Sequence, residues 1–391
     1  MRSLPTYAWT LMALLTGILA GGLMPDLLAP VAAATASFIR LVVALVPILI
    51  VAALSPAIAT LVRRRLAGRF ATAVVVWYVL SSTLAGLFGL IVSSMVFGIP
   101  LTMEDGSAWA EAINMLSSLR QQGGASAPLI AIVVAILLGM AAGHVAPLGA
   151  FLARVERGLA RAGRGLGYAM IPVVLCLGVT VGVQFGTRLG MGHYLTMTLY
   201  TALLCFVWWL FYVFAIIRHV AKRAVRDVLI DYYLPTAVFA AGTCSSLATL
   251  PVNLANVRKV GVRDEVADFV LPFGAVANLD ASALAYVAYA PFVLTYIFGI
   301  EISWTILLIA WPALVLFTIA APGLPAGMGT ALWSSTLFAS MLGLEDPVRT
   351  NFITTWIALA GGLPDMLRTA TNCTGDGFTA IVFDSWFERF S

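Results

Sequence analysis

The sequence predicts an all-α polytopic membrane protein with eight transmembrane helices and two re-entrant helical hairpins. Hydrophobic residues make up 61% of the 391 positions and charged residues only 10%, which is more apolar than a soluble domain. Such a chain has too few polar side chains to cover itself in water, so lipid is its expected solvent. Two further observations support this class: the basic residues lie in alternate loops, and the C-terminal apolar segments are interrupted.

The first six spans are continuous apolar segments, each close to the roughly 20 residues that a membrane-crossing helix needs. They are predicted at residues 7–24, 38–62, 72–97, 128–152, 165–185 and 194–217. The first has no small-residue cleavage pattern and is long for a signal peptide, so we expect a retained span.

The basic residues predict the orientation. If the N-terminus is cytoplasmic and the spans alternate, all four basic clusters lie on the cytoplasmic side, as the positive-inside rule requires. These clusters occupy residues 63–69, 154–164, 218–226 and 258–263. The distribution explains the net charge of +4 without a nucleic-acid partner. We therefore expect a multi-pass protein of the cell inner (plasma) membrane.

Two later apolar segments are predicted to enter the membrane and return. Residues 229–254 have basic residues at both ends and are split by the small, hydroxyl-rich stretch 240–248 (AAGTCSSLA). Residues 305–342 have acidic flanks and contain the helix-breaking stretch 320–329 (AAPGLPAGMG). The flanking charges predict that the two hairpins enter from opposite sides.

Each predicted hairpin is followed by an unusual span. Residues 266–298 contain ANLDAS at 277–282, and residues 351–383 contain Gly-Gly-Leu-Pro at 361–364 before a polar stretch. The two hairpin–span units predict an inverted repeat. Non-helical backbone persists at membrane depth only inside protein or beside a cavity. Paired broken segments of this kind indicate the binding site of a transporter.

Four polar residues of the last span are spaced three, four and four apart, which places them on one face of a helix. They are Asp365, Arg368, Asn372 and Asp376. A charge at membrane depth costs at least about 2.5 kcal/mol, so these side chains need partners, water or a ligand. We predict a substrate site, with a salt-bridge lattice that locks two helices as the alternative.

Asp280 lies in the stretch Asn-Leu-Asp-Ala-Ser, whose alternating polar residues fit an unwound segment rich in oxygen ligands. Such oxygens suit an alkali cation; the alternative is that Asp280 caps a helix break. In the third span, Tyr78 precedes Ser81 and Ser82 by three and four residues. Serines in spans usually bond to their own backbone, so this pattern by itself is a weak signal.

These segments resemble the glutamate transporter family, the dicarboxylate/amino acid:cation symporters, over almost the whole chain. The resemblance is strongest after residue 240. Four motifs carry it: SSLATLP at 245–251, LPFG through Ser282 at 271–282, GLP at 323–325, and DMLRTATNCTGD at 365–376.

The resemblance implies a homotrimer that works as an elevator. Scaffold spans 1, 2, 4 and 5 would occupy residues 1–67 and 128–190. The mobile transport domain would consist of the third span at 68–98 and of residues 191–391, with both hairpins.

The resemblance also implies the roles of single residues. Arg368 would bind a side-chain carboxylate of the substrate, a bidentate task for arginine, and Asp365 its amino group. The remaining substrate contacts would be Ser246, Ser282, Leu324, Thr369 and Asn372. One sodium site would consist of Gly274, Asn278, Asn372 and Asp376, and another of Tyr78, Ser81, Ser82, Asn278 and Asp280.

The sequence departs from the family at several of these places. Leu279 stands where the family has methionine, which puts a third sodium site and the stoichiometry in doubt. Cys244 and Met366 occupy the positions where an arginine is usual, so Asp365 lacks that counter-ion. Gly361 replaces an acidic residue one turn before Asp365, and Met328 replaces a glycine of the second hairpin tip.

The predicted function is symport of an acidic amino acid such as aspartate or glutamate, coupled to Na⁺. One alternative is a symporter of C4-dicarboxylates or other organic anions, with H⁺ as the coupling ion. Another is a non-transporting sensor or anion channel on the same fold. No nucleophile–base pair, metal cluster or nucleotide loop is evident in the sequence, so an enzyme is not expected.

Overall fold

The computed structural model describes residues 6–63, 69–98, 127–302, 304–318 and 328–387. Within these ranges the chain forms helices and connecting turns, without a strand. The N-terminal half contains α1 (Thr6–Leu23), α2 (Pro25–Arg63), α3 (Arg69–Phe97), α5 (Ala127–His144), α6 (Ala146–Leu210) and the π-helix η1 (Phe211–Val220).

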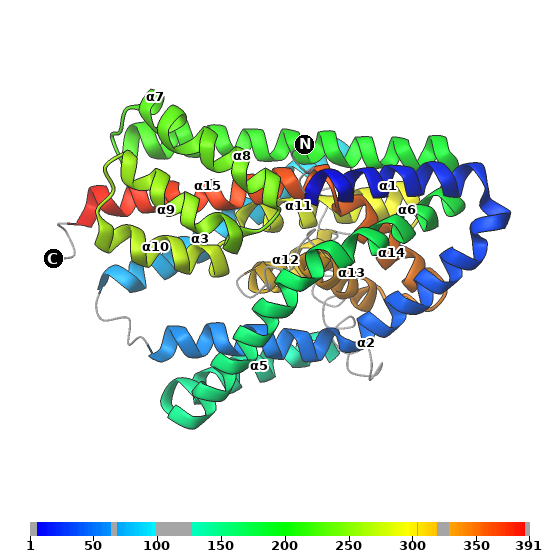
Figure 1. The fold of residues 1–391 in the computed structure, drawn as a ribbon, viewed down its shortest axis with the longest axis horizontal. Coiled ribbons are helices and arrows are strands. Elements are labelled where there is room, and N and C mark those ends of the chain that lie inside the picture. The colour runs from blue at the N-terminus through cyan, green and yellow to red at the C-terminus, as the bar shows by residue number, and fades with distance from the viewer. Residues whose placement is uncertain (1–5, 64–68, 99–126, 303, 319–327, 388–391) are drawn as a thin grey trace.

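The C-terminal half consists of shorter helices (Figure 1). They are α7 (Val225–Asp227), η2 (Val228–Tyr233), α8 (Leu234–Thr243), α9 (Ser246–Lys259), α10 (Asp264–Ala277), α11 (Asp280–Pro291), η3 (Phe292–Ile297), α12 (Trp304–Thr318), α13 (Met328–Met341), α14 (Val348–Ala360) and α15 (Leu363–Trp386).

Three helical stretches in the described part are long and apolar enough to cross a membrane. They are Thr72–Phe97, Gly190–Val220 and Asp264–Ile297. Many large apolar side chains on these and neighbouring helices are exposed, among them Leu80, Met95 and Leu199. A surface of this kind is stable against lipid rather than water, as expected for an all-α membrane protein.

Helices α1 and α6 lie side by side along one edge of the molecule (Figure 1). Their contact depends on glycines: a Cβ atom on Gly17 or Gly21 of α1, or on Gly178 or Gly182 of α6, would collide with the backbone of the other helix. Small residues four apart allow helix backbones to approach closely in a membrane, where packing drives association.

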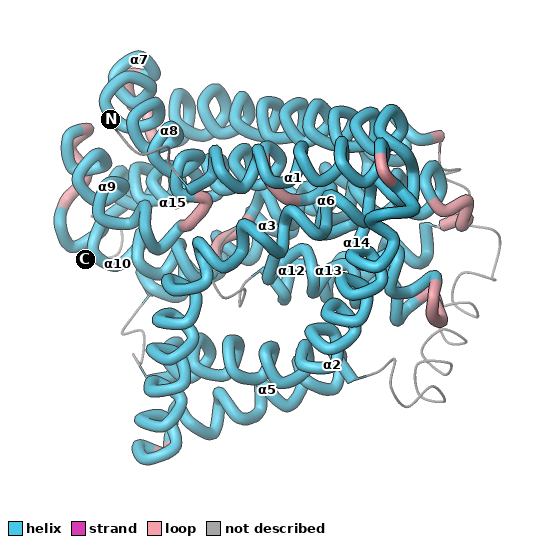
Figure 2. Tube along the Cα trace, turned by 45° about the vertical axis from the view of Figure 1, so that its right-hand side comes forward, coloured by secondary structure: helices cyan, strands magenta, loops and turns pink. Residues whose placement is uncertain are grey.

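Helices α2 and α5 pack against each other on the opposite side of the molecule (Figure 2). Helix α3 instead packs against α11 and α12, and α15 contacts α8, α9, α10 and α11. Segments close in sequence therefore belong to different parts of the bundle, and α15 lies where most of the C-terminal helices meet.

Several predicted span boundaries were wrong. Helix α2 begins at Pro25 rather than at residue 38. The fourth helix ends at His144 instead of continuing to 152, because Pro147 has no N–H to continue the helical ladder. The fifth span was predicted to begin at residue 165, whereas its helix begins at Ala146; the predicted separation of the spans at 165–185 and 194–217 is confirmed by a break at Gly186, whose φ is 73°.

The first predicted hairpin is confirmed as two helices joined by a tight turn. Helix α8 ends where Cys244 adopts a left-handed conformation with φ 47° and ψ 35°. Ser245 then caps α9, its hydroxyl accepting from the Ala248 N–H at 3.3 Å. The second hairpin consists of α12 and α13, which contact each other. Its predicted tip, with Gly323, Leu324 and Pro325, lies outside the described residues.

Both helices that follow the hairpins are broken. The predicted break in residues 266–298 is confirmed: α10 ends at Ala277, Asn278 and Leu279 are non-helical, and α11 begins at Asp280. The predicted last span is also two helices, because Gly361 is extended and Gly362 has a φ of 66°. The two units therefore share one plan, in which a hairpin precedes an interrupted helix.

Candidate functional site

The predicted polar face of α15 is buried inside the protein. Asp365, Arg368, Asn372 and Asp376 are each no more than 4% exposed. The break before α15 lies at one end of this face, and the break between α10 and α11 lies beside its middle, where Asn372 contacts Ala281 and Ser282. The spacing predicted that these side chains share one face of a helix, and the structure shows that this helix is α15 and that all four are buried.

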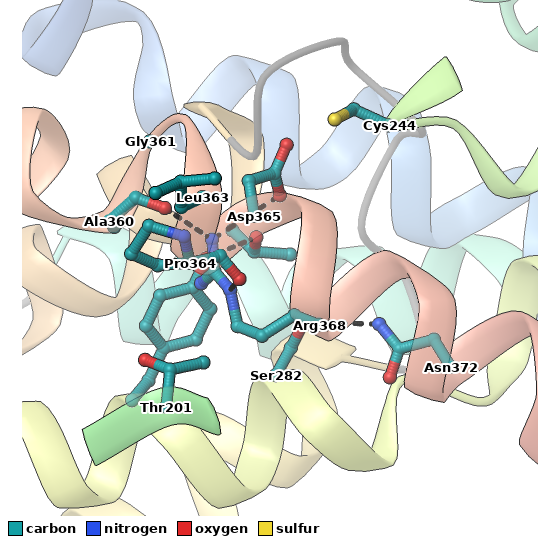
Figure 3. Close-up of polar contacts among 12 residues, drawn as sticks. Thr201, Cys244, Ser282, Ala360, Gly361, Leu363, Pro364, Asp365, Arg368 and Asn372 are labelled. Atoms are coloured by element: carbon teal, nitrogen blue, oxygen red, sulfur yellow. Dashed lines mark hydrogen bonds and ion pairs between the residues drawn. The ribbon is translucent and has the colours of Figure 1, made fainter. Parts of the chain in front are cut away.

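Arg368 lies at the junction of α14 and α15 (Figure 3). Its Nη2 donates to the Ala360 carbonyl at 2.7 Å and to Asp365 Oδ1 at 3.3 Å, and its Nε donates to the Pro364 carbonyl at 3.3 Å. The Ala360 carbonyl is available because Pro364, four residues later, has no N–H to donate to it. The Gly-Gly-Leu-Pro sequence thus creates an acceptor that Arg368 uses.

Helix ends at this junction favour both charges. Arg368 contacts the C-terminal end of α14, where the helix dipole favours a cation, and Asp365 lies in the first turn of α15, where it favours an anion. Tyr194 bridges the break: its hydroxyl accepts from the Leu363 N–H at 2.9 Å and donates to the Gly361 carbonyl at 3.3 Å. Backbone groups that the break would leave unpaired are therefore satisfied.

The Arg368–Asp365 pair retains unused hydrogen-bonding capacity. Arg368 Nη1 and Asp365 Oδ2 are both buried and have no hydrogen-bond partner among the described residues. The Arg368 guanidinium also lies over the ring of Tyr286, 4.6 Å from its centroid, and 6.0 Å from that of Tyr289. One cationic donor and one anionic acceptor thus remain, beside an aromatic wall.

Asp376 lies further along α15, in the first predicted cation site. Its Oδ1 accepts from Asn278 Nδ2 at 3.0 Å, while Asn278 Oδ1 is buried without a hydrogen-bond partner in the described part. A Cβ atom on Gly274 would lie 2.5 Å from both Asp376 Oδ1 and the Tyr78 hydroxyl. Glycine therefore leaves room for these oxygens, and Tyr78 lies beside Asp376.

Asp280 occupies the second predicted cation site. Its Oδ1 accepts from Ser81 at 3.0 Å and from Ser82 at 2.7 Å. The structure thus brings two of the predicted ligands, Ser81 and Ser82, into contact with Asp280. Tyr78 instead donates to the Val270 carbonyl at 3.0 Å. The third donor to Asp280 is Tyr212 of η1, at 3.1 Å from Oδ2, a residue that the sequence interpretation missed.

Asn372 connects the two broken segments. Its Oδ1 accepts from the Ala281 N–H at 2.8 Å, and its Nδ2 donates to the Ser282 hydroxyl at 3.4 Å. The first N–H groups of a helix have no partner within that helix, so Asn372 satisfies one of those at the start of α11. The predicted ligands Asn372 and Ser282 are therefore in direct contact.

The remaining predicted substrate residues are placed less tightly. Thr369 is buried on α15, 7% exposed. Ser246 is the first residue of α9, at the turn of the first hairpin. Leu324 lies outside the described residues. The Cys244 thiol at the hairpin turn donates to the Ala241 carbonyl at 3.4 Å, and Figure 3 shows its sulfur on the side of the site where Asp365 lies.

The alternative of a salt-bridge lattice between helices is not what forms here. Among the described residues, the ion pair of Arg368 is with Asp365 of its own helix. A lattice between segments does exist at the other end of α15, where buried Asp384 pairs with Arg223 at 2.7 Å and with Arg263 at 3.6 Å. The two ends of α15 therefore use their charges differently.

Several aromatic hydroxyls around the site escaped the sequence interpretation. The Tyr232 hydroxyl lies within hydrogen-bonding distance of Asn253 Oδ1, at 2.9 Å, and of the Thr374 carbonyl, at 3.0 Å, and can donate to one of them at a time. Tyr289 shares a hydrogen bond of 2.6 Å with Thr201. Neither tyrosine belongs to a local motif, so no signal in the sequence pointed to them.

Comparison with known proteins gives the family. The sequence profile described as the sodium:dicarboxylate symporter family matches residues 7–386. The chain belongs to this family. Its members are transporters, and the apolar helices fit a multi-pass membrane protein.

Curated relatives in the sodium:dicarboxylate symporter family are similar over part of their length. The chain is 28% identical over 223 residues to the "Proton/sodium-glutamate symport protein" of Bacillus subtilis, which covers 56% of this chain and 48% of that protein. It is 33% identical over 159 residues to human "Excitatory amino acid transporter 1", covering 40% of this chain and 28% of the relative. The matches thus span about half or less of these relatives.

Mouse "Neutral amino acid transporter B(0)" is 30% identical over 151 residues, covering 38% of this chain and 26% of that protein. Similarity within the family therefore extends to proteins named for acidic and for neutral amino acids.

Proposed function

We propose that this protein is a secondary transporter that couples the movement of a cation to the uptake of an acidic amino acid, with Na⁺ as the proposed cation. One observation carries the proposal. The buried site has an Arg368–Asp365 pair with one unused donor and one unused acceptor, next to two buried carboxylates, Asp280 and Asp376, that form no ion pair with a basic side chain in the described part.

The charges support a zwitterionic substrate. Arg368 and Asp365 have opposite charges, so the pair is neutral and can take the two ends of a ligand that is itself both cationic and anionic. Asp365 Oδ2 would accept from an amino group, and Arg368 Nη1 would donate to a side-chain carboxylate. A ligand between them would satisfy two buried groups whose isolation is costly.

The carboxylates support a cation. Two buried negative charges without a cationic partner are unfavourable, because desolvation of each costs several kcal/mol. A cation beside Asn278 Oδ1 and Asp376 would compensate one of them. The oxygens of Gly274 and Asn372 would complete that site, and Tyr78 would adjoin it. Oxygen donors of this kind suit hard cations.

The proposal also covers the oligomeric state, the orientation in the membrane and the transport movement. We infer a homotrimer with a cytoplasmic N-terminus and an elevator movement of residues 68–98 and 191–391 against a scaffold of residues 1–67 and 128–190. The close packing of α1 against α6 before Gly186, and of α3 against α11, is what such a division requires. Cross-linking in membranes would test the trimer.

Uptake of labelled aspartate into proteoliposomes tests the function. We expect uptake that requires external sodium, and competition by glutamate. Uptake that is unchanged when sodium is replaced by choline would contradict sodium coupling, and a response to a proton gradient would then favour H⁺.

The family description favours one second candidate, a dicarboxylate symporter. Asp365 argues against it, because its carboxylate would repel a ligand with two negative ends and no amino group. Protection from thermal unfolding by succinate but not by aspartate would favour this candidate. Substrate-independent anion current without uptake would instead indicate a channel.

A further inference from the structure

Among the described residues, Asp280 accepts more hydrogen bonds than the other carboxylates of the site, although no cationic side chain pairs with it. It is 2% exposed, and its two oxygens accept three hydrogen bonds, from Ser81, Ser82 and Tyr212. An ionised carboxylate has roughly four acceptor positions. Neutral protein donors therefore occupy most of the capacity that a cation would otherwise use.

Tyr212 is held rigidly in this position. It is 3% exposed, and its ring stacks on Phe378 of α15 at 5.6 Å between centroids, while Trp208 of α6 packs edge-on at 5.8 Å. These two ring contacts restrict rotation of the side chain and hold the hydroxyl toward Asp280 Oδ2. The interaction is thus built into the packing of α6, η1 and α15.

Asp376 provides the internal contrast. Among the described residues, Asp376 accepts a hydrogen bond from one amide, Asn278 Nδ2, and the carbonyl oxygen of the same amide has no hydrogen-bond partner there. The two buried carboxylates therefore differ in how many hydrogen bonds they accept from protein donors. Of the two, Asp280 is the one that accepts from a tyrosine hydroxyl among the described residues, at Oδ2.

We infer that Tyr212 is a specificity-determining residue for cation coupling, because its hydroxyl competes with a cation for Oδ2 of Asp280. This inference rests on the proposed cation-coupled function and concerns how strongly the Asp280 site takes part in it. While Tyr212 donates to Asp280, a cation at this site must either displace the Tyr212 hydroxyl or share the Asp280 oxygen with it. The Asn278–Asp376 site then dominates the sodium dependence.

Tyr212→Phe tests the competition, because it removes the hydroxyl and keeps the ring between Trp208 and Phe378. A hydrogen bond to a charged group is worth about 1.5–3 kcal/mol, so its loss should lower the half-saturating sodium concentration for aspartate uptake about tenfold or more. The sodium dependence should also become steeper as a second ion binds. Thermal shift by sodium without substrate should move in the same direction.

The matched control is Tyr200→Phe, the same chemical change on α6 about three turns earlier. Its hydroxyl is buried without a hydrogen-bond partner among the described residues, so the sodium dependence should stay that of the unsubstituted protein. A second control is the double variant Tyr212→Phe/Asp280→Asn. The gain must disappear there, because the anionic oxygen released by the first substitution is absent.

The results separate this inference from the proposed function. If unsubstituted protein shows sodium-dependent uptake and Tyr212→Phe leaves the half-saturating concentration unchanged, the inference is wrong and the function stands. A higher half-saturating concentration would also overturn it, since the tyrosine oxygen would then be a cation ligand. Uptake without sodium dependence in the unsubstituted protein would contradict the proposed function, and the inference with it.

Discussion

The two ends of the polar face of α15 differ in charge. Near the helix break, Arg368 and Asp365 form a neutral pair surrounded by backbone carbonyls and tyrosine rings. Further along, Asp376 and the neighbouring Asp280 are both anionic and receive hydrogen bonds from neutral amide and hydroxyl groups. The first end is suited to a zwitterion and the second to a cation, although one helix supplies three of the four charges.

The same difference gives a physical reason for both helix breaks. A continuous helix would consume its own carbonyl and N–H groups, whereas the breaks expose acceptors for Arg368 at one end and N–H groups for Asn372 at the other. If the comparison is correct, substitutions at the two ends should separate substrate affinity from sodium dependence.

The largest effect is expected from Asp376→Asn. Loss of the charge at the proposed cation site should raise the half-saturating sodium concentration by about a hundredfold or more, because breaking a buried charge pair costs about 3–5 kcal/mol. Sodium titration of aspartate uptake measures this. The matched control is Asp384→Asn, two turns later on α15, where the carboxylate pairs with Arg223 and Arg263; its sodium dependence should not change.

Arg368→Ala should produce the complementary loss. Affinity for aspartate should fall by about thirtyfold or more, because truncating one partner of a buried charge pair costs about 2–5 kcal/mol. Stabilisation by sodium, measured by thermal shift, should persist. Arg368→Lys should not restore affinity, since lysine lacks the planar fork. Equal loss of substrate and sodium effects would show that Arg368 is structural.

Gly274→Ala should impair the cation end by a smaller amount. The added Cβ would lie 2.5 Å from Asp376 Oδ1 and from the Tyr78 hydroxyl, and overpacking costs about 1–3 kcal/mol. We expect about a tenfold rise in half-saturating sodium. Gly375→Ala is the control, because its Cβ would be 3.7 Å from its nearest neighbour, Asn278 Nδ2. Identical behaviour of the two variants would argue against a site beside Gly274.

The smallest expected effect is that of Tyr286→Leu at the substrate end. A cation–π contact is worth about 1 kcal/mol, so affinity for aspartate should fall by about fivefold while sodium titration is unaffected. Tyr286→Phe keeps the ring beside Arg368 and loses the hydrogen bond to Thr330. It should therefore retain most of the affinity; a loss equal to that of the leucine variant would assign the effect to the hydroxyl.

Local patterns predicted much of this site. Proline, paired glycines and the Asn-Leu-Asp stretch indicated both helix breaks. Their effect on the backbone is local, so it can be predicted without knowing the fold. The spacing of Asp365, Arg368, Asn372 and Asp376 likewise predicted one buried face. Span boundaries were less predictable: apolar composition alone does not show that α2 starts at Pro25 or that α5 ends before Pro147.

Sequence patterns were enough to predict that charged residues gather near two interrupted helices. The partners of those charges depend on how distant helices pack. Ser82 and Tyr212 meet Asp280 across separations of 198 and 68 positions, and Asn372 caps a helix that starts 92 positions before it, at Asp280. Periodicity reports on neighbours along one helix, whereas the compensation of a buried charge depends on which other helices pack against it.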